Sequence, residues 1–501
     1  MAINFAKGHP PSELLPNGML ARAFQDVTNI LLSNSQKDAS PILPPEVQAQ
    51  PNLLQYCAGR GAAGYRKKLA HFISRQANDG VSAHNSMLMT TNGVSHGLDL
   101  VASSLALPGD TVLVENPCYF LASSIFRDHH LTVVPLDLRR AVAATGNSNG
   151  SANDEVVNFE ALLDAHPRCK LVYLVPTNCN PTGRTMSSPE RAALVAAAAR
   201  RGVVVVADEV YHFLDWKPQG ERPARMVAYD AAFLSHLSKT TDAPYDESQT
   251  SSAQSLTKDT GRRDGRSGSG DSDDDDDGVY ASPVEPPKRR KGNDTEAAGR
   301  GGGIGNVVSV GSFTKICSPG LRLGWLEASP GLLELISNGY IQSGGGVAPL
   351  QEAVMATLLN PLPESGTAEE SPLDRHVARL RTSYASRASA LVKALESFPS
   401  AFPEIAEVPS GGFFCWVRLK SGVDAETLAA VAETSHGVSF LPGVRCHPNA
   451  STDSQVLQKE AGELHAWVRL CFAMLSEDAI HEGVKRLAEA VESSAGVQKD
   501  P

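Results

Sequence analysis

Cysteine is scarce in this sequence, with eight in 501 residues. No two cysteines form a CxxC pair, and no Cys/His spacing resembles a zinc-binding motif. A chain of this length with so few cysteines does not depend on a disulfide framework. We therefore expect free thiols in a reducing compartment, and no metal site.

Long apolar runs are also missing, since no stretch approaches the roughly 18–20 residues that a membrane-spanning helix needs. Residues 1–10 carry neither a basic leader before an apolar run nor an Arg-rich amphipathic pattern. The net charge of -11 argues against a general nucleic-acid binder, because neutralising phosphates requires clustered Lys and Arg. We expect a cytoplasmic protein without membrane or nucleic-acid partners.

One long segment, from about residue 235 to 303, is nearly devoid of large apolar residues and rich in Ser, Gly, Asp and Thr. Such a composition cannot bury enough apolar area to offset chain entropy, so it predicts a disordered insertion. Residues 144–154 form a shorter polar insertion. The basic patch in the long segment could be a nuclear-localisation signal or a tail that binds a partner, and a solvated insertion without its own function is the simpler interpretation. The patch consists of Lys288, Arg289, Arg290 and Lys291.

Strands and helices alternate around this insertion. Residues 171–176 form an apolar run of strand length, and Ser187, Pro189 and Glu190 are typical of a helix start. The β-branched run 203–207 indicates a strand buried on both faces. Strand, helix and strand in this order predict a parallel sheet.

Further elements extend the pattern to the whole chain. We expect a helix opening at Gly93, strands at 111–115 and 307–312, a helix at 374–398, and strands at 412–419, 438–441 and 467–472. The predicted fold class is α/β, with a large domain and a smaller α+β domain. The predicted bounds are 45–359 for the large domain, interrupted by the insertion, and 360–501 for the small domain. Residues 1–44 should join the small domain or cover the substrate site.

Polar motifs follow several predicted strands, at the sheet edge where α/β proteins bind ligands. They are Asp208-Glu209-Val210-Tyr211, Asn180-Pro181-Thr182-Gly183, Ser312-Phe313-Thr314-Lys315 and Pro319-Gly320-Leu321-Arg322-Leu323-Gly324-Trp325. Each alone has an ordinary explanation as a cap, a turn or a surface charge. Gly93-Val94-Ser95 opens a helix whose free N–H groups suit a phosphate, although a plain helix start is commoner. Together the motifs bring an acid, a lysine, an arginine and a phosphate cradle to one edge.

This ordered series resembles the fold-type I pyridoxal-phosphate enzymes of the class I/II aminotransferase family, over nearly the whole chain outside the insertion. The motifs from Ser312 to Trp325 look like the branch of α-aminoadipate, kynurenine and related aminotransferases. The opening motifs, Gly8-His9-Pro10 and Leu14-Leu15-Pro16, look like the same branch.

The resemblance implies roles for individual residues around pyridoxal phosphate. Lys315 matches the lysine that is joined to the cofactor aldehyde and then moves the proton at the substrate Cα. Asp208 matches the carboxylate that keeps the ring nitrogen protonated. Asn180 and Tyr211 match the groups that bond the ring hydroxyl oxygen, and Tyr119 matches the aromatic that stacks on the ring.

The remaining matches concern the phosphate, the partner subunit and the substrate. The implied phosphate ligands are Gly93, Val94, Ser95, Ser312 and Arg322. Tyr56 matches a tyrosine that reaches the phosphate of a neighbouring subunit, which implies a homodimer. Arg469 matches the arginine that grips the substrate α-carboxylate, and Gly8 is expected beside the substrate.

The implied activity is transfer of an amino group from an amino acid to a 2-oxo acid. 2-Oxoglutarate and glutamate would form one pair, and aminoadipate or an aromatic amino acid would belong to the other. A pyridoxal-phosphate lyase or synthase acting at Cβ or Cγ would use the same Lys315, Asp208 and Arg469, so these residues do not discriminate. A non-catalytic regulator is a third alternative. Bacterial regulators of this type carry an N-terminal helix-turn-helix domain, for which the segment before Tyr56 is too short.

Overall fold

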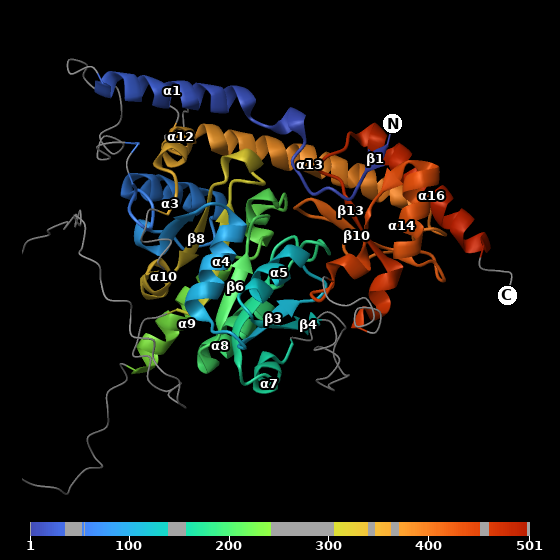
Figure 1. Ribbon diagram of the computed structural model, residues 1–501, viewed down its shortest axis with the longest axis horizontal. Coiled ribbons are helices and arrows are strands. Elements are labelled where there is room, and N and C mark those ends of the chain that lie inside the picture. Colours follow the sequence, from blue (N-terminus) through green and yellow to red (C-terminus); the bar gives the residue numbers. More distant parts are fainter. Residues whose placement is uncertain are drawn as a thin grey trace, which may run out of the picture.

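The computed structural model describes residues 2–35, 53–54, 56–138, 157–241, 305–338, 346–361, 370–450 and 460–497. The shorter predicted insertion, the basic patch and most of the long predicted insertion lie outside these ranges. Figure 1 shows a large sheet-centred region beside a C-terminal region, with the N-terminal segment running across both. Among the described helices, none has the length and apolar character to cross a membrane.

The large region is built on a seven-stranded sheet with the order β2-β8-β7-β6-β5-β3-β4. The strands are β2 (Leu88–Thr91), β3 (Thr111–Glu115), β4 (Thr132–Leu136), β5 (Cys169–Leu174), β6 (Val204–Asp208), β7 (Val307–Ser312) and β8 (Gly324–Ala328). Strand β8 is antiparallel to both of its neighbours, and the other pairs are parallel. The predicted α/β class with a mostly parallel central sheet is therefore confirmed.

Strand β6 explains why this sheet lies in the centre of its region. Val204 and Val206 pack into one apolar cluster, whereas Val205 and Ala207 pack into another, because successive side chains point to opposite faces. Helices contribute to both clusters. One face carries α3 (Ala63–Ala77), α4 (Val94–Leu105), α5 (Phe120–Asp128), α10 (Pro330–Ser337) and α12 (Pro349–Leu359), and the other carries α7 (Phe159–Asp164), α8 (Ser188–Arg201) and α9 (Met226–Thr241).

Helix α8 begins where the sequence predicts. The Ser187 hydroxyl accepts a hydrogen bond from the Glu190 N–H, and the Glu190 carboxylate accepts one from the Ser187 N–H, which completes a capping box. Gly202 ends the helix with a φ of 62°, a conformation that glycine adopts without strain. The chain then enters β6 directly, so this cap positions the strand that ends in Asp208.

The C-terminal region contains a four-stranded antiparallel sheet with the order β12-β13-β10-β9. Its elements are β9 (Glu404–Ile405), β10 (Phe414–Arg418), β12 (Leu441–Pro442), β13 (Trp467–Cys471), α13 (Pro372–Glu396), α14 (Ala425–His436) and α16 (Glu477–Val497). Strand β1 (Ile3–Asn4) pairs in parallel with β11 (Val438–Ser439), and α1 (Asn17–Ser35) packs against α12. The N-terminal segment therefore contacts both regions.

Helix α9 overlaps the start of the predicted insertion. Residues 235–241 continue helix α9, whose apolar residues Met226, Tyr229 and Phe233 pack into the cluster on one face of the sheet. On the far side of the insertion, Asn306 donates its N–H to Asp230 Oδ1 at 3.0 Å. This contact lies at the amino end of β7, the edge of the sheet opposite to the polar motifs.

Candidate active site

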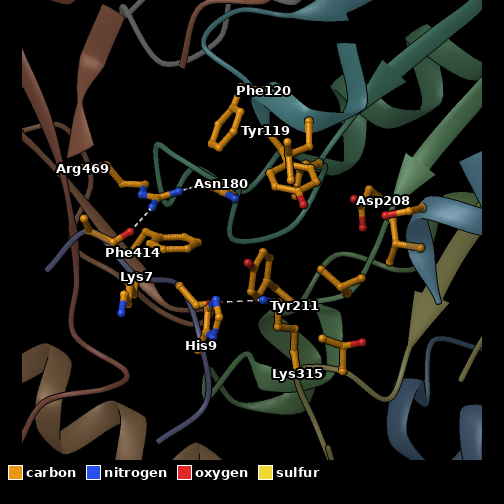
Figure 2. Close-up of a pocket in the computed structure, with 18 of the residues that line it drawn as sticks. Lys7, His9, Tyr119, Phe120, Asn180, Asp208, Tyr211, Lys315, Phe414 and Arg469 are labelled. Carbon is orange, nitrogen blue, oxygen red and sulfur yellow. Dashed lines mark hydrogen bonds between the residues drawn. The ribbon is translucent and has the colours of Figure 1, made fainter. Parts of the chain in front are cut away.

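A cavity of about 320 Å³ lies where the carboxyl ends of β5, β6 and β7 meet the C-terminal sheet and the N-terminal segment (Figure 2). Many of the residues predicted for the site line it. These are Gly8, Val94, Ser95, Tyr119, Asn180, Asp208, Tyr211, Lys315, Arg322 and Arg469. They come from positions 8 to 469 of the chain, so the fold collects motifs that are remote in sequence.

The acid of the site is Asp208, at the end of β6. Its side chain is 3% exposed, and burial raises the pKa of its carboxyl to about 6. Oδ2 accepts a hydrogen bond from the Tyr173 hydroxyl at 2.9 Å. Oδ1 is buried and has no hydrogen-bond partner among the described residues. A buried carboxylate with a spare oxygen suits a cationic N–H donor, because such a donor would offset the desolvation.

The lysine of the site is Lys315, three residues after β7. The pKa of its ammonium is lowered to about 8, mainly by burial and to a smaller extent by the Arg469 charge, against the opposing effects of Cys471 and Asp208. Nζ donates a hydrogen bond to the Gly8 carbonyl at 2.8 Å. At Gly8 a Cβ would lie 2.5 Å from the Phe414 ring, so the close approach of this segment requires glycine. Lys315 is therefore held inside the cavity, with much of it neutral just above neutral pH.

Helix α4 points its amino end at the cavity. Gly93 precedes the helix with a φ of 86°, and no described side chain caps the first turn. A Cβ at Gly93 would lie 2.9 Å from Arg322 Nη2, so the missing side chain makes room for the guanidinium. Uncapped N–H groups, the positive end of the helix dipole and an arginine together make a binding place for a phosphate.

Arg469, in the middle of β13, faces the sheet edge from the C-terminal region. Its Nη1 donates to Asn180 Oδ1 at 2.8 Å, and its Nη2 donates to the Ala6 carbonyl at 2.5 Å (Figure 2). The guanidinium carbon lies 4.2 Å from the centroid of the Phe414 ring. Nε is buried without a hydrogen-bond partner among the described residues. This planar cation in an aromatic setting suits a carboxylate.

Three predicted residues do not line the cavity. Gly93 lies just behind it, next to Arg322. Ser312 is 2% exposed, and its hydroxyl lies within hydrogen-bond distance of the Thr314 hydroxyl and the Leu323 carbonyl. Tyr56 is 78% exposed and lies away from the cavity.

Sequence reasoning missed several residues of this site, among them Lys7, His9, Phe120 and Phe414 in the lining, and Tyr173 behind Asp208. A signal for Tyr173 was present, because a tyrosine in a buried strand needs a partner for its hydroxyl. Lys7 and His9 flank Gly8, but their position depends on the pairing of β1 with β11. A strand of two residues is too short to give a recognisable sequence pattern, so this pairing could not be predicted.

Comparison with known proteins gives three similarities that bear on this site. The chain is 24% identical over 447 residues to aromatic-amino-acid aminotransferase 1 of Thermococcus litoralis, covering 87% of this chain and 80% of that protein. Its fold matches the structure of α-aminoadipate aminotransferase from Thermus thermophilus, complexed with N-(5'-phosphopyridoxyl)-L-leucine, with a TM-score of 0.63 at 23% identity, over 99% of this chain and 93% of that chain. The HTH-type transcriptional regulator NorG of Staphylococcus aureus (strain USA300) is 19% identical over 386 residues, covering 76% of this chain and 64% of that protein.

The family comparison covers most of the sequence. The model of the family described as aminotransferase class I and II matches residues 19–263 and 277–487. The predicted family is thereby confirmed, and with it the transfer of amino groups as the general chemistry. This chain belongs to the class I and II aminotransferases.

Proposed function

We propose that this protein uses pyridoxal phosphate to transfer an amino group between an L-amino acid and a 2-oxo acid. Pyridoxal phosphate is the cofactor expected in this family, and it holds the electrons released when a bond at the substrate Cα breaks. One observation carries the proposal: in the part of the chain that the structure describes, one oxygen of the buried Asp208 has no hydrogen-bond partner and no side chain caps the start of α4, in a cavity that also holds Lys315. These three features suit the ring nitrogen, the aldehyde and the phosphate of one molecule.

The residues of the sheet side would bind and orient the cofactor. Asp208 would accept the ring N–H, and Tyr119 would cover the ring face. Asn180 and Tyr211 would bond the ring hydroxyl oxygen. The first N–H groups of α4 and the Arg322 guanidinium would hold the phosphate.

Lys315 would move the proton at the substrate Cα. A pKa of about 8 lets this amine accept a proton and return it near neutral pH, where a lysine with its ordinary value of 10.5 would remain charged. Because Nζ is bonded to the Gly8 carbonyl, the N-terminal segment sets the position from which the amine acts.

Arg469 would bind the α-carboxylate of the substrate, exchanging its present contacts for that anion. Lys7 and His9 line the same cavity. Burial and the Lys315 and Lys7 charges lower the pKa of His9, so the added positive charge comes from Lys7, and it favours a second carboxylate on one of the substrates. We therefore assign 2-oxoglutarate and glutamate as one pair. Aminoadipate or an aromatic amino acid is the proposed partner, in keeping with the names of the similar proteins.

A homodimer completes the proposal. Tyr56 is 78% exposed and the neighbouring Leu54 is 71% exposed, so this segment presents a large apolar surface on the single chain. Tyr56 would reach the phosphate site of the partner subunit. Sedimentation of the wild-type protein and of Tyr56→Phe tests whether each forms a dimer. Comparing their affinities for the cofactor tests whether the Tyr56 hydroxyl contacts the phosphate in the partner subunit.

The experiment for the proposed function is the visible spectrum of the purified protein with pyridoxal phosphate. We expect a yellow band that bleaches with glutamate or aminoadipate and returns with 2-oxoglutarate. A yellow protein that releases products of Cβ or Cγ elimination would instead support the lyase alternative. A protein that takes up cofactor but turns over no amino acid would support the regulator alternative, to which the similarity with NorG gives some weight.

A further inference from the structure

A second cavity, of about 510 Å³, lies between α5 and the C-terminal region. Phe120, the first residue of α5, lines both this cavity and the active-site cavity. Ser124, one turn further along α5, lines only the second cavity. Phe120 therefore belongs to the boundary that the two spaces share, and Figure 2 shows its ring beside Tyr119 at the edge of the site.

Hydrogen bonds at both ends of α5 brace the second cavity. The Cys118 N–H donates to the Cys446 carbonyl at 2.8 Å, just before the helix. Near its other end, Arg127 Nη2 donates to the Pro448 carbonyl at 2.7 Å. These bonds tie α5 to residues 446–448 on both sides of Phe120, so the space has defined walls.

The lining of the second cavity is mainly apolar. It consists of Phe120, Ser124, Glu426, Ala429, Leu441, Pro442, Arg445, Pro448 and Ala450. Its two charged members form an ion pair with each other, from Arg445 Nε to Glu426 Oε1 at 2.7 Å. The described lining therefore has no net charge to attract an anion, and it suits an alkyl or aromatic group.

We propose that Phe120 determines substrate specificity by closing the active-site cavity against this second cavity, and so limits the length of apolar side chain that the enzyme accepts. The inference rests on the proposed function and deepens it. Among the residues of the active-site lining that have no assigned role in the chemistry, Phe120 has an apolar space directly behind it. A smaller residue at this position joins the two spaces.

The test compares amino donors of increasing length, from 2-aminobutyrate to homophenylalanine, with wild type and Phe120→Ala. The kcat/KM for homophenylalanine relative to 2-aminobutyrate should rise at least about tenfold in Phe120→Ala, because space for several methylene groups becomes available. Phe120→Leu should give an intermediate ratio. This milder substitution keeps the test possible if the alanine variant fails to fold. An unchanged ratio in both variants overturns the proposal.

A second substitution tests whether the gain uses the second cavity. Ala429 is half-buried in its lining on α14, whereas Ala430 is exposed on the same helix. Phe120→Ala with Ala429→Trp should return the ratio to the wild-type value, and Phe120→Ala with Ala430→Trp should keep the gain. A gain that survives Ala429→Trp overturns the role of the second cavity.

Binding measurements separate this inference from the proposed function. The dissociation constant of 4-phenyl-2-oxobutanoate, measured by calorimetry, should follow the same order among the variants without requiring turnover. If the wild-type protein turns over no donor, the proposed function is wrong. If it turns over 2-aminobutyrate while neither turnover nor binding responds to residue 120, only the specificity inference is wrong.

Discussion

The two walls of the active-site cavity differ in how far their polar groups are already satisfied. On the sheet side, Asp208 Oδ1 has no partner among the described residues, and no described side chain caps the start of α4. On the C-terminal side, Arg469 already donates to Asn180 and to the Ala6 carbonyl. The first wall is ready for a cofactor that brings the missing partners. The second wall must exchange contacts when a substrate arrives.

Removal of Lys315 should have the largest effect, because the sheet wall then loses its reacting group. We expect Lys315→Ala to lower kcat/KM by at least roughly 10⁴-fold, the upper range for a catalytic proton-transfer group. Lys393→Ala, at an exposed position on α13, is the matched control and should retain full activity. Steady-state kinetics with glutamate and 2-oxoglutarate check both. Substantial turnover by Lys315→Ala would contradict the assignment.

The pKa of Lys315 also predicts a pH dependence. The neutral amine reacts with the cofactor aldehyde, and the pKa of about 8 lies below the ordinary 10.5. The rate of cofactor uptake by the cofactor-free protein should therefore rise as pH increases through about 8 and level off above it. A rise centred near 10.5 would show that burial does not shift this lysine.

Asp208→Asn should separate function from stability. Activity should fall roughly 10²–10³-fold, since the ring N–H loses its anionic partner. The pKa of the Asp208 carboxyl is about 6 in the folded protein, above its ordinary 3.8. Ionising this buried carboxyl therefore costs stability, and the cofactor-free protein becomes less stable as pH rises from about 4 through 6. At pH 7 and without cofactor, the free energy of unfolding of the variant should therefore be about 1 kcal/mol higher than that of wild type. Equal stability of the two proteins in urea would contradict an unsatisfied carboxylate.

Arg469→Lys tests the C-terminal wall, where Arg469 must exchange its present hydrogen bonds for the substrate carboxylate. A lysine cannot form the paired hydrogen bonds of a guanidinium, so kcat/KM for amino acids should fall about 10–100-fold. An amine donor without an α-carboxylate provides the control, because its turnover should not depend on the paired hydrogen bonds of the Arg469 guanidinium. A similar loss with both donors would assign Arg469 to structure instead of carboxylate binding.

Lys7→Ala should have the smallest effect. The Lys7 side chain is exposed, and exposed charge pairs contribute at most about 1 kcal/mol, so KM for 2-oxoglutarate should rise no more than about fivefold. The rise should shrink as salt is added. Pyruvate, which has no second carboxylate, serves as the control, and an equal rise in its KM would remove the case for a dicarboxylate.

Sequence patterns predicted the elements that follow strong local rules. The strands at 111–115 and 307–312 match β3 and β7, and the capping residues of α8 lie where their spacing placed them. Residues that end parallel strands, such as Asp208 and Lys315, were predictable because the sheet edge gathers them.

Contacts between remote segments could not be predicted in this way. Phe120 and Phe414 have the pattern of ordinary core residues, and only the docking of the C-terminal sheet brings them to the cavity. The Gly8 carbonyl reaches Lys315 because β1 pairs with β11, a contact between positions more than 430 apart that no local period encodes. Average composition also gave no sign of where α9 ends, because the helix extends to Thr241 through a stretch of polar sequence.

The contact between Asp230 and Asn306 has a consequence for engineering and for evolution. It fastens the chain on either side of residues 242–304 at the edge of the sheet opposite to the cavity. Because both anchors lie far from the reacting groups, a change in chain length between them need not move Asp208 or Lys315, and the entropic cost of closing a longer connection grows only logarithmically. The position is accordingly suited to carry a fused reporter domain, or a break that divides the enzyme into two complementing fragments.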